Sequence, residues 1–370
     1  MKILKLFLIL SISTLVALLI AEGISRVLPV QSVPPILSYD SKIGFRHRPG
    51  MSGTWTIENP GHFTINSYGF RDVEWKLQKE KKYRVAVLGD SFAEALQVDL
   101  EQSFPKLIEL SLGSVEVMNF GISGQGQVEE LLTYRHYVRP FKPDLVVLCF
   151  FPGNDFVENW RRRMPMLRFP VYVKTSSNGV EVIPVLGNER FERLRAIIDW
   201  VHNHSSLMQR FQDARRNINR RRIGGLTEAG LWDGAFGNPR GIVPDFDGIW
   251  MFTEKLLIQL YHDVTADMGR NDRFLVVCLT EGVQVHQSQR KAFMKQYPGL
   301  DPDYSENRLR TFCESSGIPF LGISKDMIQY NMSTNKLLHG FDERGHGHFN
   351  ADGHRIAADS IGRRLKVMLP

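Results

Sequence analysis

Five short apolar runs, separated by helical patterns, constrain the fold of this chain more than any other feature. The runs are rich in Val, Leu and Phe and lack alternation with polar residues, as in strands covered on both faces. They are Val85–Leu88, Val115–Asn119, Leu145–Phe151, Phe274–Leu279 and the weaker Pro319–Leu321. Strand and helix in alternation predict an α/β fold, a parallel sheet with helices on both faces.

The segments between the runs carry helical periodicity. Phe252, Leu256, Leu260 and Val264 recur every four residues, as on the buried face of an amphipathic helix. A last helix is expected after Asn350, which is a good N-cap residue.

Polar motifs follow several of these strands directly. Gly89-Asp90-Ser91 follows the first run, Asn119–Gln127 (NFGISGQGQ) follows the second, and Gly153-Asn154-Asp155 follows the third. Ligands of open parallel sheets bind at the carboxyl ends of the strands. We therefore expect these motifs to meet at one edge of the sheet.

The side chains at that edge suit ester chemistry, which requires a nucleophile, a base and donors to an oxyanion. Ser91 is the candidate nucleophile and His348, just before the last helix, is the candidate base. The backbone N–H groups of Ser91 and Gly124 and the side-chain amide of Asn154 are the candidate oxyanion donors. Taken singly, each motif has a structural explanation, because Gly-Asp-Ser and Gly-Asn-Asp are common in turns and helix caps.

The ordered combination resembles the SGNH (GDSL-type) hydrolases, which are named for a Ser, Gly, Asn and His in four blocks. GDS matches the first block at Ser91, ISG the second at Gly124, GND the third at Asn154, and HFNADGH the fourth at His348. The resemblance covers residues 83–155 and about 245–370. It implies a flavodoxin-like three-layer α/β/α sandwich, ester or acyl chemistry, and neither a metal nor an organic cofactor.

One departure from the family pattern concerns the acid of the triad. Members usually carry it two or three residues before the histidine, where this chain has His346 and Gly345. Asp342 is the predicted acid, with Glu343, or a dyad that has no acid, as the alternatives. A metal site formed by the histidines and carboxylates around this block is the less favoured interpretation; these residues are His346, His348, His354, Asp342 and Asp352.

The N-terminus predicts an uncleaved membrane anchor, with a cleaved signal peptide as the alternative. Lys2 and Lys5 precede an apolar stretch from Leu6 to Ala21 that lacks a clear cleavage site. Positive charge before the stretch favours a cytoplasmic N-terminus, with the rest of the chain outside the cytoplasm. The motifs DSKIGFRHRPG and NSYGFRD also resemble membrane-anchored bacterial members of the same family.

The predicted organisation is a signal-anchor at 1–28, an extracytoplasmic collar at 29–80, and a hydrolase-like domain at 81–370. Residues 156–245 interrupt the strand–helix rhythm and are expected to form an insertion, a candidate lid. It includes a hairpin around FPVYVKTSSNGVEVIPV, a helix around Phe191–His202, and the basic stretch Ala214–Arg222.

Composition adds few constraints. The chain has 370 residues, 43% of them hydrophobic, so it can bury a core. The net charge is +6, partly from clusters such as Arg161–Arg163, which are interpreted as solvated helix faces. We expect no nucleic-acid partner, and we expect the three isolated cysteines to be buried apolar side chains.

The sequence therefore predicts a serine esterase attached to the inner membrane, with its catalytic domain in the periplasm. Its substrate is expected to be an acylated small molecule or polysaccharide, such as an O-acetylated envelope carbohydrate. An O-acyltransferase that uses the same Ser-His site is one alternative. A non-catalytic carbohydrate- or envelope-binding protein on the same fold is the other, and the displaced acid favours it. The sequence does not indicate an oligomeric state.

Overall fold

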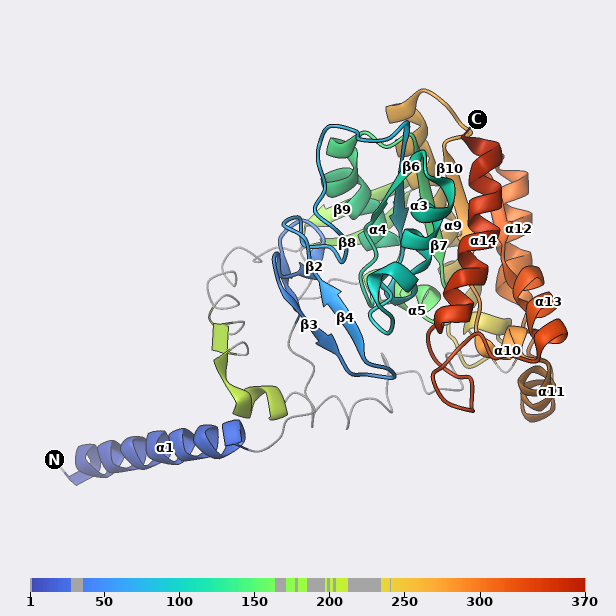
Figure 1. The fold of residues 1–370 in the computed structure, drawn as a ribbon. Helices are drawn as coiled ribbons and strands as arrows, with labels where there is room; N and C mark the ends of the chain where they lie inside the picture. The colour runs from blue at the N-terminus through green and yellow to red at the C-terminus, as the bar shows by residue number, and fades with distance from the viewer. Residues whose placement is uncertain are drawn as a thin grey trace.

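A computed structural model describes residues 2–27, 36–163, 171–176, 179–184, 197, 200–201, 204–211, 234–239 and 241–369 (Figure 1). Within these ranges, five strands form one parallel sheet in the order β11-β10-β7-β5-β6. The strands are β5 (Tyr83–Leu88), β6 (Val115–Asn119), β7 (Leu145–Phe150), β10 (Phe274–Cys278) and β11 (Phe320–Gly322). All five predicted apolar runs thus form strands, and the α/β fold class is confirmed.

The strand order is that of flavodoxin-like sheets, in which the chain starts near the middle and winds outward in both directions. The direction of winding reverses between the neighbouring strands β5 and β7. Strand β6 lies beside β5 on one side of this pair, and β10 lies beside β7 on the other. Ligands bind at such a reversal, outside the carboxyl ends of the strands. Ser91 follows β5 and Asn154 follows β7, so both lie at this position.

Helices cover both faces of the sheet and bury its apolar side chains in two clusters. One layer consists of α3 (Phe104–Leu112), α13 (Ser324–Thr334) and α14 (Ala351–Met368). The other consists of α4 (Gln127–Thr133), α5 (Asp155–Arg162), α9 (Phe246–Met268) and α12 (Tyr304–Ser315). Figure 1 shows α14, in red, beside α3. As predicted, the side chain of Asn350 caps α14 by accepting the N–H of Gly353.

Short elements connect the layers. At the carboxyl edge of the sheet lie α2 (Ser91–Glu94), α10 (Gly282–Val285) and α11 (Gln287–Gln296), and three single turns are η1 (Leu100–Gln102), η2 (Tyr134–Val138) and η3 (Arg139–Phe141). The three cysteines are buried, as expected.

Two small hairpins precede the sheet. In the first, β1 (Leu37–Asp40) pairs with β2 (Gly44–His47), and in the second, β3 (Ser52–Trp55) pairs with β4 (Gly61–Thr64). The predicted collar is described over residues 36–80. Several of its apolar side chains, including Ile43, Phe70 and Trp75, belong to the same core cluster as Leu88 of β5. The collar therefore shares a hydrophobic core with the sheet domain.

A buried arginine fastens the collar to the start of the sheet domain. Arg71 is 1% exposed, and its guanidinium donates to the backbone carbonyls of Glu94 and Val98. Burial lowers the pKa of Arg71 to about 10, although nearby Glu94 and Asp72 favour its charged form. The loop that follows Ser91 is thus held from the collar side.

The predicted insertion is described only in part. Its hairpin is present, with β8 (Val171–Ser176) antiparallel to β9 (Gly179–Pro184). The basic stretch Ala214–Arg222 and most of the predicted helix Phe191–His202 lie outside the described residues. One basic cluster differs from the expectation of a solvated face: Arg162 is 2% exposed because it pairs with the buried carboxylate of Glu129.

Candidate active site

The turn that carries Ser91 is fixed by its neighbours. A side chain at Gly89 would lie 2.9 Å from Cβ of Ala93 and 3.1 Å from Cβ of Cys149, so the tight exit from β5 requires glycine. Asp90 caps α2, because its carboxylate accepts the N–H of Phe92 at 3.0 Å. This cap leaves Ser91 as the first residue of α2, partly exposed at the sheet edge.

The structure brings Ser91 and His348 together. Nε2 of His348 lies 2.8 Å from Oγ of Ser91, across 257 residues of sequence. The imidazole also packs on the ring of Phe92, with ring centroids 4.9 Å apart. The 2.8 Å distance between Nε2 and Oγ is that of a nucleophile and its general base.

The acid beside the imidazole is Glu58, from the tip of the β3–β4 hairpin in the collar. Its carboxylate oxygens lie 2.9 and 3.1 Å from Nδ1 of His348, and the carboxylate also accepts the backbone N–H of His348 at 3.1 Å. A carboxylate at Nδ1 keeps the proton on that nitrogen and leaves Nε2 free to accept the hydroxyl proton. Ser91, His348 and Glu58 thus have the arrangement of a catalytic triad.

The predicted acid, Asp342, does not contact His348, and the carboxylate beside Nδ1 belongs to Glu58 instead. The carboxylate of Asp342 pairs with the guanidinium of Arg344 at 2.6 Å, and this contact lowers the pKa of Asp342. Glu343 is exposed on the same turn. The carboxylate of Glu58 already fills the space beside the imidazole of His348. A Cβ on the adjacent Gly347 would lie 2.6 Å from Oε2 of Glu58.

Backbone strain marks the position of Glu58. Its φ is +68°, in the left-handed region that few residues other than glycine adopt. Strained backbone of this kind tends to persist at functional sites, where the surrounding structure holds it. The hairpin tip is held because Asn59 donates to the carbonyl of Gln97 at 2.8 Å and the N–H of His62 donates to Asp99 at 2.9 Å.

Opposing effects set the pKa of His348. Burial favours the neutral ring and lowers its pKa, but the hydrogen bond and charge of Glu58 raise it, as do the charges of Asp90 and Glu94. The net pKa is raised above the ordinary 6.5. The site therefore favours the charged form of this imidazole.

Asn154 lies at the N-terminus of α5 and faces the turn that carries Ser91. Its side-chain NH2 donates to Asp90 at 2.9 Å, and the second hydrogen of the same NH2 is left for another acceptor. Burial raises the pKa of Asp90, while its hydrogen bonds from Phe92 and Asn154 act in the opposite direction. Asp90 thus links the turns after β5 and β7.

Gly124 lies in the turn after β6 with φ +75°. A Cβ there would contact nothing within 4 Å, so the left-handed backbone, and not lack of space, accounts for glycine. The preceding residue, Ser123, donates its hydroxyl to Glu94 at the end of α2. The turn after β6 is thereby fastened to the helix that begins with Ser91.

Two other residues considered in the sequence have structural partners. Asp155 is buried and accepts the N–H of Phe151 at 2.9 Å and the amide of Gln127 at 2.7 Å; burial raises its pKa well above the usual range. His354 is 1% exposed, and its Nδ1 accepts the N–H of Phe104 at 3.3 Å. No three of the His, Cys, Asp and Glu side chains within the described ranges are grouped to hold a metal ion.

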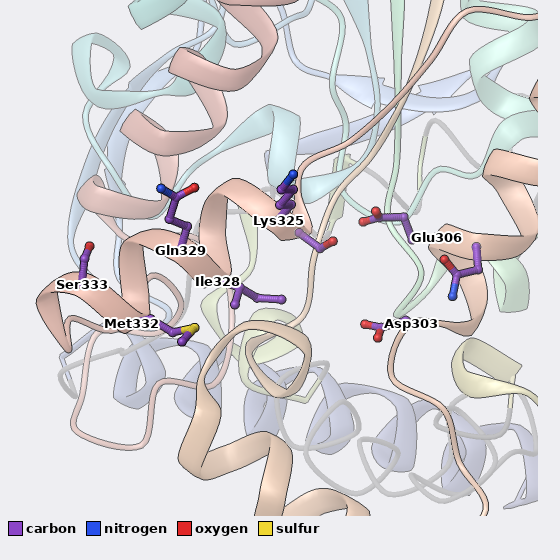
Figure 2. Close-up of a pocket in the computed structure, with 9 residues that line it drawn as sticks. Asp303, Glu306, Lys325, Ile328, Gln329, Met332 and Ser333 are labelled. Atoms are coloured by element: carbon purple, nitrogen blue, oxygen red, sulfur yellow. The ribbon is translucent and has the colours of Figure 1, made fainter.

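A pocket of about 640 Å³ lies outside this constellation, between α12 and α13 (Figure 2). Figure 2 shows Glu306 and Asp303 on one wall and Lys325, Ile328 and Gln329 on the other. None of Ser91, His348 and Glu58 lines it.

Sequence reasoning missed Glu58. The acid was sought beside His348, whereas Glu58 precedes that histidine by 290 residues. The motif resemblance of the collar was noted, but only as a mark of the membrane-anchored type. No periodicity or spacing in the sequence relates a hairpin tip to a loop before the last helix.

The chain matches no protein-family model and no curated protein sequence. Similar solved structures include an acetyl xylan esterase (15% identity, TM-score 0.40), with 76% of this chain and 99% of that chain covered. A G-D-S-L family lipolytic protein from Veillonella parvula shares 10% identity at a TM-score of 0.38, covering 77% of this chain and 97% of that one. An acetyl xylan esterase from Geobacillus stearothermophilus shares 12% identity at a TM-score of 0.39, covering 77% and 95%.

Proposed function

We propose that this protein is a serine ester hydrolase in which Ser91 is the nucleophile, His348 the general base and Glu58 the acid. The observation that carries the proposal is the pair of contacts made by one imidazole, 2.8 Å from Ser91 on Nε2 and 2.9 Å from Glu58 on Nδ1. Three segments distant in sequence supply these groups. In the sequence the displaced acid favours a non-catalytic protein, whereas the contact of Glu58 with His348 supports the enzyme.

The reaction begins when Nε2 of His348 takes the proton of Ser91 as Oγ attacks the acyl carbon. The carbonyl oxygen becomes an oxyanion, which accepts hydrogen bonds from the N–H groups of Ser91 and Gly124 and from the amide of Asn154. The intermediate collapses, and the leaving alcohol takes the proton back from Nε2. Throughout, Glu58 stabilises the transient imidazolium.

Water completes the cycle by attacking the acyl group on Oγ of Ser91. His348 takes a proton from this water, and collapse of the second intermediate breaks the bond to Oγ. The proton then returns to Oγ, and the carboxylic acid leaves. The cycle consumes one ester and one water and returns Ser91 and His348 to their starting protonation states.

The reaction is proposed to take place outside the cytoplasm, on O-acyl groups of envelope carbohydrate. Helix α1 (Lys2–Val27) supports this placement, because its segment Lys5–Val27 is long and apolar enough to cross a membrane. Its apolar side chains, such as Leu6, Phe7 and Leu19, are exposed. Lys2 and Lys5 at its start favour a cytoplasmic N-terminus at the inner membrane.

Covalent labelling tests the proposed nucleophile. We expect a fluorophosphonate probe to label the native protein on the peptide that contains Ser91, as read by mass spectrometry. The Ser91→Ala variant should not be labelled, since fluorophosphonates react with activated serines. A folded native protein that is never labelled and does not hydrolyse p-nitrophenyl acetate would overturn the proposal.

The role of Asn154 in the oxyanion hole gives a second expectation. Asn154→Ala should lower kcat for p-nitrophenyl acetate by about 10²–10³-fold with little change in KM, as when one oxyanion donor is removed. Asn307→Ala is the matched control, because Asn307 lines the pocket of Figure 2 and none of the three triad residues does. Equal kcat values for the two variants would exclude Asn154 from the oxyanion hole.

A further inference from the structure

Glu94 carries a buried carboxylate that the proposed mechanism does not use. It is the last residue of α2, the helix that begins with Ser91, and it is 0% exposed. A carboxylate removed from water requires hydrogen-bond donors. Both oxygens have one: the ring of His47 contacts Oε1, and the hydroxyl of Ser123 donates to Oε2.

His47 reaches Glu94 from the collar. It is the last residue of β2 and is 0% exposed. Its Nδ1 lies 3.3 Å from the carbonyl of Gly69, and its Nε2 lies on the carboxylate of Glu94. Both ring nitrogens therefore face oxygen acceptors.

Ser123 reaches Glu94 from the turn after β6, directly before Gly124. This turn packs closely against α2, since a Cβ on Gly121 would lie 2.6 Å from the backbone nitrogen of Glu94 and 2.7 Å from Cβ of Ala93. Asn119 adds a second tie by donating to the carbonyl of Ala93 at 2.7 Å. The turn that carries Gly124 is therefore tied to α2 by Asn119 and Ser123.

We propose that Glu94 is a positioning residue, which holds the Ser123–Gly124 turn so that the Gly124 N–H faces the oxyanion. His47 holds one carboxylate oxygen of Glu94, and the other oxygen holds the hydroxyl of Ser123. The collar thus contributes to both sides of the site, through Glu58 at the base and through His47 at the oxyanion turn. This inference rests on the proposed ester hydrolysis.

Ser123 offers the sharpest test, because it is partly exposed and two variants separate its hydroxyl from its size. Ser123→Ala removes the donor to Glu94, whereas Ser123→Thr keeps it. We expect kcat and kcat/KM for p-nitrophenyl acetate to fall together by about 10–100-fold in Ser123→Ala, less than when an oxyanion donor is removed outright. Ser123→Thr should stay within about threefold of the native enzyme.

Binding of phenylboronic acid supplies a readout that a merely structural role would not change. The boron forms a tetrahedral adduct with Oγ of Ser91, which imitates the intermediate. Its affinity should fall in Ser123→Ala by the same factor as kcat, with KM and the melting temperature nearly unchanged. Glu94→Gln should lower the affinity as well, and Ser111→Ala on α3 should not.

The outcomes separate this inference from the proposed function. A native protein that neither hydrolyses the ester nor is labelled on Ser91 overturns both. An active native enzyme whose Ser123→Ala variant keeps its kcat and its boronate affinity overturns the positioning role of Glu94 alone. Should Glu94→Gln fail to fold, the two Ser123 variants still decide.

Discussion

Replacing Ser91 by alanine should lower kcat for p-nitrophenyl acetate by about 10⁴-fold or more, because no other group takes over the covalent step. His348→Gln should be about as damaging, since the serine hydroxyl then lacks its base. The reason is the 2.8 Å contact that makes the two side chains one functional unit. The measurement is steady-state hydrolysis by purified variants whose folding is checked by circular dichroism.

The double variant adds a test of that unit. When two residues act together, removing the second costs little once the first is gone. We therefore expect Ser91→Ala/His348→Gln to be no slower than either single variant. Multiplicative losses would mean that the two residues act independently, which would contradict the proposed proton transfer between them.

Glu58→Gln should lower kcat by about 10³–10⁴-fold, because the amide no longer favours the productive tautomer and charge of the imidazole. The change keeps the size of the side chain and therefore the hairpin tip. The matched control is Asp342→Asn, which removes the acid predicted from the sequence. This variant should stay within about twofold of the native rate, because Asp342 contacts Arg344 and not His348.

The pH profile separates the two carboxylates further. Activity requires neutral His348, whose pKa is raised above 6.5, so kcat/KM should fall on acidification with a midpoint above that value. Glu58→Gln removes the main raising contribution and leaves the lowering effect of burial. The midpoint should therefore move to lower pH in Glu58→Gln and stay in place in Asp342→Asn. The opposite pattern would restore Asp342 as the acid.

Sequence reasoning placed Ser91 and His348 at the same edge of the sheet, and the structure finds them in contact there. For Ser91 this was possible because a parallel sheet brings every strand's carboxyl end to one edge, so motifs that follow strands must converge. His348 follows no strand directly, and its place came from the resemblance to the SGNH hydrolases. The same logic could not identify Glu58. The collar lies outside the strand–helix alternation, and its two hairpins carry no pattern that fixes where they dock.

The collar was expected to be a segment between the anchor and the main domain. In the structure the aromatic side chains of Phe70 and Trp75 share the core of the sheet domain, and polar residues of the collar contact the site at several points. Docking of this kind follows from the summed fit of Phe70, Trp75 and Arg71, which no single residue pattern reveals. Arg162 is a second example. It belongs to a basic cluster that was expected to face solvent, but in the structure it is buried in an ion pair with Glu129.

The sequence by itself determined the α/β class, the five parallel strands, the capped last helix and the edge at which the polar motifs meet. These follow from local apolar patterns and from rules of chain connection that act over short distances. Only the tertiary structure decided which carboxylate reaches Nδ1 of His348 and what holds the turn at Gly124. Both depend on the packing of a hairpin against loops far away in the chain, and close packing is a property of the assembled surfaces, not of any one segment.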